Sequence, residues 1–305
     1  MGTPGARRRV GDQAPGGAAA AQARGHGGRD RDRAGGRLPP RRLGPHVTPA
    51  TVHLVGAGPG DPELLTVRAA RLLGAADLVL ADQLVPDAVL ALARADAEVV
   101  PVGRRCGRVV VAHPAVVDRM VAAARAGRRV VRLKGGDPVV FGRGGEEVLE
   151  LAARGVRAEL VPGISSAIAA PELAGIPVTH RDLAGGFLVL TGRRAVDDQL
   201  DDADWDAAAR FSGTVVVLMG AGRTAALCTE LVARGRASTT PAAVVARAGR
   251  PDQQVVTGTL ADLHERARDA QVGTPAVVVV GAVVEVLRAT ADAVQQRTTS
   301  TAACL

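Results

Sequence analysis

The sequence predicts an α/β fold of two α/β domains in series, preceded by a basic extension that is disordered. From Val47 onward, short β-branched apolar runs alternate with segments rich in Ala, Leu and Arg. Two of the apolar runs end in glycine-rich loops that lead into helical segments. The first 46 residues hold ten arginines and three aspartates, a charge of +7 that equals the net charge of the whole chain. The remaining residues are therefore electrically balanced.

The predicted elements fall into two series, β-branched runs giving strands and Ala/Leu-rich segments giving helices. In the first series we expect strands at 51–55, 77–81, 98–102, 130–133 and 157–161, and helices near 63–74, 86–94, 114–126 and 144–154. In the second we expect a helix at 165–173, strands near 187–191, 214–219, 242–247, 253–258 and 275–280, and helices near 223–234 and 259–269. The boundary at Val161-Pro162-Gly163 gives domains over 47–162 and 163–291, followed by a flexible tail over 292–305.

Residues 1–46 consist mainly of Gly, Ala, Arg and Pro without apolar periodicity, which predicts disorder. A basic arm can bind nucleic acid or anionic lipid, but the absence of interleaved aromatic residues favours a solvated extension. The chain has no apolar run of membrane-spanning length and no signal-peptide core, so we expect a cytoplasmic protein. Cys106, Cys228 and Cys304 form no CxxC pair, so neither a disulfide framework nor a metal site is indicated.

The first glycine-rich loop of interest follows the strand Val130–Leu133 and reads Lys134-Gly135-Gly136-Asp137-Pro138. Adjacent glycines let a ligand approach the backbone closely, and Asp137 supplies a carboxylate for hydroxyl groups or a positive charge. The alternative is an ordinary strand-to-helix turn without a ligand. The second loop, Gly56-Ala-Gly58-Pro59-Gly60-Asp61, approaches a dinucleotide fingerprint. Asp61 replaces its last glycine, however, and Pro59 stiffens the turn, which is evidence against a nicotinamide or flavin site.

Six motifs together give a family resemblance. They are GAGPGDPELLT at 56–66, ADQLV at 81–85, VGRRCG at 102–107, RLKGGDPVVFGRGGEE at 132–147, VPGISSAIAAPELAGIPVTHRD at 161–182 and VVLMG at 216–220. Over about residues 51–290 the chain resembles the uroporphyrinogen-III C-methyltransferases, members of the tetrapyrrole (class III) methyltransferase family. The resemblance implies the tetrapyrrole methylase fold, with a ligand cleft between its two domains, and a homodimer.

The activity that the resemblance implies is methyl transfer from S-adenosylmethionine to C2 and then C7 of uroporphyrinogen III, which gives precorrin-2. It implies Asp82, at the carboxyl end of a strand, as the catalytic base; the alternative for Asp82 is a turn or N-cap aspartate ahead of Pro86. The family's proton-donating lysine is replaced here by Arg104. Arginine does not release a proton near neutral pH, but it can bind a carboxylate with two hydrogen bonds.

The resemblance also implies ligand-binding residues. For S-adenosylmethionine these are Pro59, Gly135, Gly136, Asp137, Val140, Ser165, Ser166, Met219 and Ala248. The substrate carries eight carboxylates, so arginines in motif loops are expected to bind it: Arg105, Arg143 and Arg181, together with Arg104. The alternatives are an N-cap role for the serines and core packing for Met219.

Two other functions remain open on the sequence alone. An RNA methyltransferase is disfavoured because three Phe, one Trp and no Tyr leave few stacking platforms, so we expect no nucleic-acid partner. A binding module without activity would retain affinity for S-adenosylmethionine without turnover. The 46-residue leader is too short for a dinucleotide domain, so we expect no fused precorrin-2 dehydrogenase. Whether the product enters siroheme or cobalamin biosynthesis is not evident from the sequence.

Overall fold

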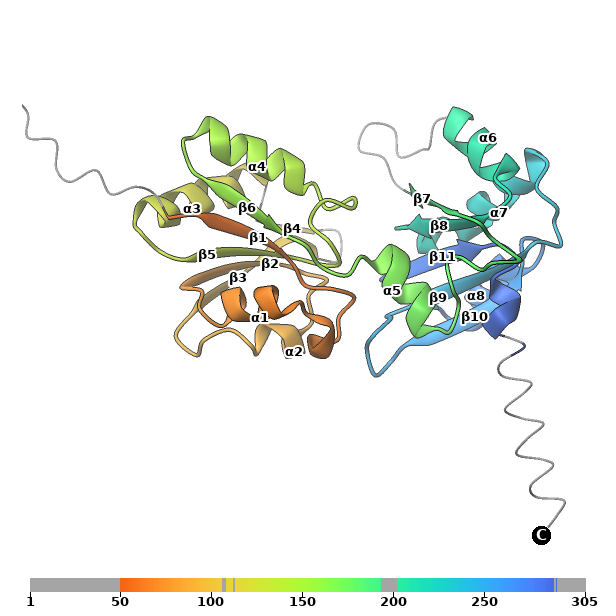
Figure 1. The fold of residues 1–305 in the computed structure, drawn as a ribbon, viewed down its shortest axis with the longest axis horizontal. Coiled ribbons are helices and arrows are strands. Elements are labelled where there is room, and N and C mark those ends of the chain that lie inside the picture. Colours follow the sequence, from red (N-terminus) through yellow and green to blue (C-terminus); the bar gives the residue numbers. More distant parts are fainter. Residues whose placement is uncertain (1–49, 106–107, 112, 193–201, 288, 290–305) are drawn as a thin grey trace, which may run out of the picture. The chain divides into compact units, whose positions relative to one another are not determined.

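The computed structural model describes residues 50–105, 108–111, 113–192, 202–287 and 289, and these form two β-sheets with flanking helices (Figure 1). The α/β fold predicted from the sequence is confirmed. The predicted extension over 1–46, the tail over 292–305, Cys106 and Cys304 lie outside the described residues. The domain boundaries stay predictions.

Six strands of the described chain form the first sheet, in the order β4-β3-β2-β5-β1-β6. They are β1 (Val52–Gly56), β2 (Leu78–Asp82), β3 (Glu98–Arg105), β4 (Arg108–Val111), β5 (Val130–Lys134) and β6 (Ala158–Val161). All neighbours are parallel except β3 and β4. The carboxyl ends of β1, β2, β5 and β6 therefore meet at one edge of the sheet, where open α/β sheets bind ligands.

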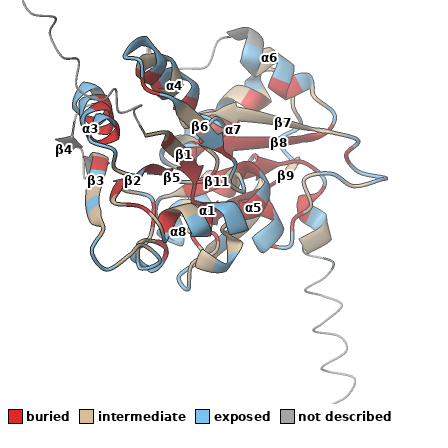
Figure 2. Ribbon diagram, turned by 60° about the vertical axis from the view of Figure 1, so that its left-hand side comes forward, coloured by how far each residue is buried: buried red, intermediate tan, exposed pale blue. Residues whose placement is uncertain are grey.

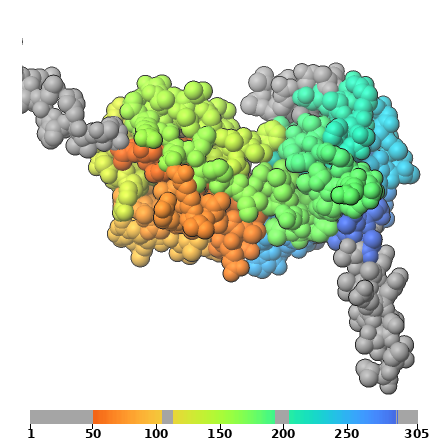
Figure 3. All heavy atoms as spheres, in the orientation of Figure 1, coloured from red at the N-terminus to blue at the C-terminus, as the bar shows by residue number. Residues whose placement is uncertain are grey.

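Side-chain alternation gives this sheet two buried faces. On one face, Leu78 and Leu80 pack with Met120 of α3 (His113–Arg125) and Leu151 of α4 (Gly144–Ala153). On the other face, Val79 and Leu133 pack with residues of α1 (Val67–Leu73) and α2 (Asp87–Leu90). The strands in the middle of the sheet are accordingly buried almost throughout (Figure 2). The loop and helix that follow β1, orange in Figure 3, lie at the surface.

The second sheet has the order β10-β9-β11-β8-β7 in the described residues. Its strands are β7 (Phe187–Thr191), β8 (Thr214–Leu218), β9 (Pro241–Ala246), β10 (Gln254–Thr259) and β11 (Ala276–Val280). Only β7 and β8 are parallel. One core cluster joins this sheet to α6 (Asp202–Arg210), α7 (Thr224–Ala233) and α8 (Leu263–Asp269), and another joins it to α5 (Ser166–Leu173).

The structure corrects several predicted elements. The helix expected over 63–74 is split, because the Thr66 side chain caps α1 by accepting a hydrogen bond from Ala69 N, leaving a short 3-10 turn at Pro62–Leu64. The helix expected from 259 begins at 263, because Asp262 Oδ1 accepts from Thr259 N and closes a turn there. The helix near 86–94 is shorter, at 87–90, and β4 and α6 were not predicted. Among the described residues, every helix is too short or too polar to cross a bilayer.

Candidate active site

Four glycines bring the loops of the first sheet into backbone contact at its carboxyl edge. A Cβ atom placed on Gly163, which follows β6, would lie 2.3 Å from the carbonyl oxygen of Gly136 and 2.7 Å from Cα of Gly56. A Cβ on Gly56 would lie 2.6 Å from the same carbonyl oxygen. Gly136 has a φ of 65° and exchanges two hydrogen bonds with Gly58, of 2.8 and 3.1 Å. Any side chain at Gly56 or Gly163 would push these loops apart.

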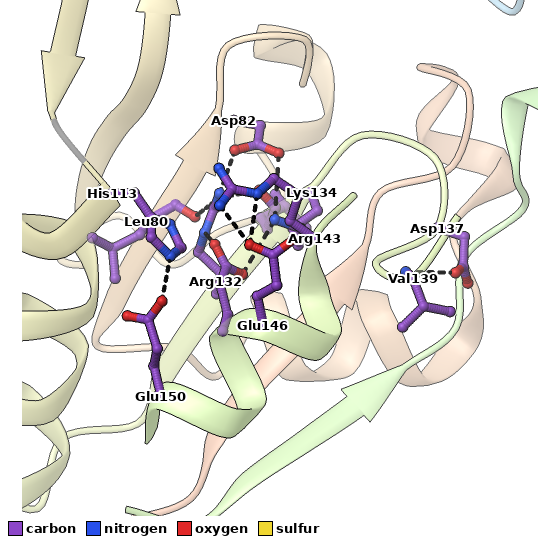
Figure 4. A network of polar contacts seen from close by, with 12 residues as sticks. Leu80, Asp82, His113, Arg132, Lys134, Asp137, Val139, Arg143, Glu146 and Glu150 are labelled. Atoms are coloured by element: carbon purple, nitrogen blue, oxygen red, sulfur yellow. Dashed lines mark hydrogen bonds and ion pairs between the residues drawn. The ribbon is translucent and has the colours of Figure 1, made fainter. Parts of the chain in front are cut away.

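Asp137 connects the loop after β5 with the chain after β6. Its Oδ1 accepts a hydrogen bond from Val139 N at 2.9 Å (Figure 4). The same oxygen accepts from Val140 N at 3.3 Å, and Oδ2 accepts from Gly163 N at 3.2 Å. The sequence suggested a carboxylate facing a ligand, whereas here both oxygens already have backbone partners. Asp137 therefore has a structural role, and direct contact with a ligand stays a prediction.

Four charged side chains form a cluster on the α4 face of the sheet, which we name the charge cluster: Asp82, Arg132, Lys134 and Glu147. Arg132 and Lys134 are two residues apart on β5, so they project from the same face. Asp82 is two residues beyond Leu80 on the neighbouring strand β2 and shares that face. Glu147 reaches the cluster from the first turn of α4, where the helix dipole favours an anion.

Each cation of the charge cluster contacts both carboxylates (Figure 4). Arg132 Nε lies 3.1 Å from Glu147 Oε1, and Arg132 Nη2 forms an ion pair with Asp82 Oδ1. Lys134 Nζ lies 3.2 Å from Glu147 Oε2 and 4.0 Å from Asp82 Oδ2. Arg132 Nη1 also donates to the carbonyl oxygens of Leu80 and Leu133. Each carboxylate thus has a different cation on each of its two oxygens.

Burial differs sharply within the charge cluster. The side chains of Arg132, Lys134 and Glu147 are 6% exposed or less, whereas the Asp82 side chain is 29% exposed. Burial lowers the pKa of Lys134, and the positive charge of Arg132 lowers it further, against the opposing effect of the two carboxylates. Asp82 is therefore the member that an outside molecule can reach, and the other three lie behind it.

Several predicted cofactor residues lie at this same edge. Pro59 lies in the loop after β1, and Gly135, Gly136 and Val140 lie in the loop after β5. Ser165 caps α5 by accepting from Ala167 N at 3.2 Å, and Ser166 begins the helix. A Cβ on Gly136 would lie 3.5 Å from both the N and the Oγ of Ser166, so these two residues are neighbours.

Two predicted cofactor residues lie on the second sheet. Met219 follows β8 with a φ of 59° and is 46% exposed. Ala248 is buried in the turn after β9. From that turn, Arg250 Nη2 donates to the carbonyl oxygen of Leu84 at 2.6 Å, so the turn contacts the loop after β2.

The structure describes the side chains of two predicted substrate arginines and only the strand positions of the other two. Arg143 is exposed at the start of α4 and binds Glu146, with Nε 2.9 Å from Oε2. Arg104 and Arg105 are described as positions on β3 opposite β4, without their side chains. Asp82 pairs with Val102, so Arg104 comes two residues further along the strand next to β2. Arg181 is exposed in the turn between His180 and Ala184.

Arg132 and Glu147 were not predicted from the sequence as site residues. The available signal was the pair of cations at alternate positions of the strand Val130–Lys134, whose other residues are apolar. No group of three or more His, Cys, Asp or Glu side chains in the described residues could hold a metal ion.

Comparisons with known proteins place the chain in a family. Residues 51–264 match the family model described as Tetrapyrrole (Corrin/Porphyrin) Methylases. A siroheme synthase of Gluconacetobacter diazotrophicus is 50% identical over 237 residues, which is 78% of this chain and 50% of that protein. The chain thus spans about half the length of the siroheme synthases that it matches.

Two further relatives are matched over most of their length. An S-adenosyl-L-methionine-dependent uroporphyrinogen III methyltransferase of Methanosarcina barkeri is 46% identical over 76% of this chain and 91% of that protein. A crystal structure of uroporphyrin-III C-methyl transferase from Thermus thermophilus, complexed with S-adenyl homocysteine, has a TM-score of 0.67 and 44% identity, and the match covers 78% of this chain and 94% of that one. The matched region includes the charge cluster and the glycine loops, and the chain belongs to the tetrapyrrole methylase family.

Proposed function

We propose that the protein is an S-adenosylmethionine-dependent C-methyltransferase that methylates uroporphyrinogen III at C2 and C7, giving precorrin-2 for siroheme or cobalamin biosynthesis. The placement of Asp82 carries this proposal. It is a partly exposed carboxylate, held by two cations, at the carboxyl edge of a parallel sheet beside close-packed glycine loops. The names of the relatives from Methanosarcina barkeri and Thermus thermophilus support the same activity.

The chemistry assigned to the protein is alignment and proton removal. The electron-rich pyrrole carbon of the substrate is the nucleophile, and S-adenosylmethionine supplies an electrophilic methyl group. The protein has to hold the two in line and accept the proton that the alkylated ring loses. Asp82 is the proposed base, because the buried cations Arg132 and Lys134 hold its carboxylate while part of the side chain stays exposed to solvent.

The loops fit S-adenosylmethionine in one specific respect. Gly135 and Gly136 bring backbone without side chains to the carboxyl edge, and Ser166, the first residue of α5, can donate its N–H and hydroxyl groups to a carboxylate. We assign the cofactor to Pro59, Gly135, Gly136, Asp137, Val140, Ser165, Ser166, Met219 and Ala248. Arg104, Arg105, Arg143 and Arg181 are assigned to the substrate carboxylates, because a guanidinium matches a carboxylate with two parallel hydrogen bonds. A cytoplasmic homodimer completes the proposal.

The test of the function is anaerobic incubation of the purified protein with uroporphyrinogen III and S-adenosylmethionine, followed over time by mass spectrometry. Two methyl groups added in sequence are the expected result. Absence of methylation, in a protein that still binds S-adenosylhomocysteine, would contradict the proposal and favour a binding module.

The test of the base is Asp82→Asn, which keeps the shape of the side chain and removes its basicity. We expect the methylation rate to fall by about 100- to 10,000-fold, the usual contribution of a general base. Affinity for S-adenosylhomocysteine, measured by calorimetry, should stay within about threefold of the parent value. Turnover of the variant at the parent rate would refute the assignment.

A further inference from the structure

Lys134 is the only lysine in the chain, every other basic side chain except histidine being arginine. It is also 3% exposed, on the central strand β5. Burying an ammonium group is costly, and the lowered pKa of Lys134 reflects that cost. A chain that uses arginine at all its other cationic positions thus has a compact point charge at this one, where a planar guanidinium would need more room.

The contacts of Lys134 indicate what the ammonium group does. Glu147 lies directly against it, with Oε2 3.2 Å from Nζ, and so fixes its direction. The ammonium then faces Asp82 Oδ2 at 4.0 Å, while Arg132 binds Asp82 Oδ1. A carboxylate bound through one oxygen alone can turn about its terminal bond, since that torsion is broad. A second cation on the other oxygen restricts this rotation.

We propose that Lys134, aimed by Glu147, is a positioning residue that fixes the carboxylate of Asp82 in the orientation needed to accept a proton from the substrate. This role rests on the proposed function, because it assumes that Asp82 is the base of a methyl transfer. Correct orientation of a catalytic group matters greatly, since a displacement of about 1 Å can cost on the order of 100-fold in rate.

The charged groups around Lys134 come from three elements. Asp82 faces it from β2, Arg132 lies beside it on β5, and α4 contributes Glu147 and, further away, Glu146, which is paired with Arg143. Asp82 and Glu147 favour the charged form of Lys134, whereas burial and Arg132 oppose it. Removing the charge of Asp82 should therefore lower the pKa of Lys134 further.

Because the chain has one lysine, the effect of the Asp82 charge on the pKa of Lys134 can be measured directly. Protein labelled with ε-¹³C lysine gives one lysine signal, whose chemical shift follows the protonation of Lys134. We expect Asp82→Asn to move the titration midpoint to lower pH. Glu150→Gln, a change on the same helix at a residue paired with His113, should leave the midpoint in place. An unchanged midpoint in Asp82→Asn would overturn the proposal.

The second test is kinetic. Lys134→Met, similar in length but uncharged, should lower kcat by about 10- to 100-fold with little change in the KM for S-adenosylmethionine, and Lys134→Arg should recover part of the loss. Lys134→Met leaves Glu147 without one cation and can impair folding. The double variant Lys134→Met/Glu147→Gln removes one charge of each sign and keeps the charge cluster balanced. Its kcat should stay low, whereas a parent-like kcat in a folded double variant would overturn the proposal.

The two hypotheses fail in different ways. A parent protein that methylates no uroporphyrinogen III overturns the proposed function, and the role of Lys134 falls with it. An active parent with a full-rate Lys134→Met variant overturns the role of Lys134 alone. Arg154→Met, which removes an exposed cation at the other end of α4, is the matched control and should leave kcat unchanged.

Discussion

Replacing Gly163 by alanine tests whether the glycine contact at the sheet edge is required. The added Cβ would lie 2.3 Å from the carbonyl oxygen of Gly136, whereas ordinary contact begins at 3.4 Å, so the two loops must separate by about 1 Å. Overpacking of this kind costs about 1–3 kcal/mol. Because both groups are backbone, no rotamer change can relieve the clash, and we expect the upper end of the range, about 3 kcal/mol.

The effect of Gly163→Ala is measurable both in stability and in binding. For a domain of about 150–250 residues, each kcal/mol shifts Tm by about 2–4 °C, so the expected fall is about 6–12 °C by calorimetry. The movement of Gly136 should also weaken binding of S-adenosylhomocysteine by about tenfold or more. A variant with the parent Tm and the parent affinity would refute the argument that these loops have no room for a side chain.

The matched control is Gly145→Ala. A Cβ on Gly145 meets no atom within 4 Å, and the residue lies in the first turn of α4. Alanine is favoured over glycine in helices by up to about 1 kcal/mol, so this variant should be as stable as the parent or more so. The pair thus separates the effect of the added methyl group from the effect of its location.

Three other predictions concern single side chains. Arg104→Met should raise the KM for the substrate by about tenfold or more with a smaller change in kcat, because a guanidinium binds carboxylates but donates no proton at neutral pH; an unchanged KM would exclude this. Burial lowers the pKa of His53 below 6.5, so the unfolded chain takes up its proton first and stability falls as the pH drops through that value. His53→Asn should reduce this loss in unfolding experiments between about pH 7 and pH 5, and an equal loss in both proteins would contradict it. Burial raises the pKa of the Cys228 thiol to about 11, so in a Cys106→Ser/Cys304→Ser variant a thiol reagent should react only after unfolding, and fast reaction of the folded protein would be the contrary result.

The sequence predicted most of the fold because strand and helix patterns are local. The strands at 130–133 and 187–191 were expected within a residue of their observed bounds, since β-branched runs end at recognisable glycines. Helix α6 was missed because Asp202–Arg210 is rich in acidic residues and its apolar residues, apart from Trp205, are all alanines. The break at Thr66 was missed because it depends on a side-chain cap inside a continuous helical pattern.

The candidate site was predictable to the extent that it lies at strand ends. Asp82 was expected at the carboxyl end of a strand and is found there, because the end of an apolar run is visible in the sequence. Its contact with Arg132 could not be predicted in this way, since it joins residues 50 positions apart. That contact depends on β5 lying next to β2, and the order of strands in a sheet is not contained in their periodicity.

The charge cluster is difficult to explain as a source of stability. Taking each charge out of water costs several kcal/mol, and well-packed apolar residues in place of a buried ion pair are often neutral or stabilising. Strand β5 could accommodate such residues, because Val130, two residues before Arg132 on the same face, is apolar and buried. The costly buried charges are instead the ones that contact Asp82 or its cation partners, and Asp82 is the one member of the charge cluster that reaches solvent. Arg132, Lys134 and Glu147 are thus best understood as a support that orients a reactive carboxylate. If so, replacing these three residues with apolar ones should raise stability and abolish methylation together.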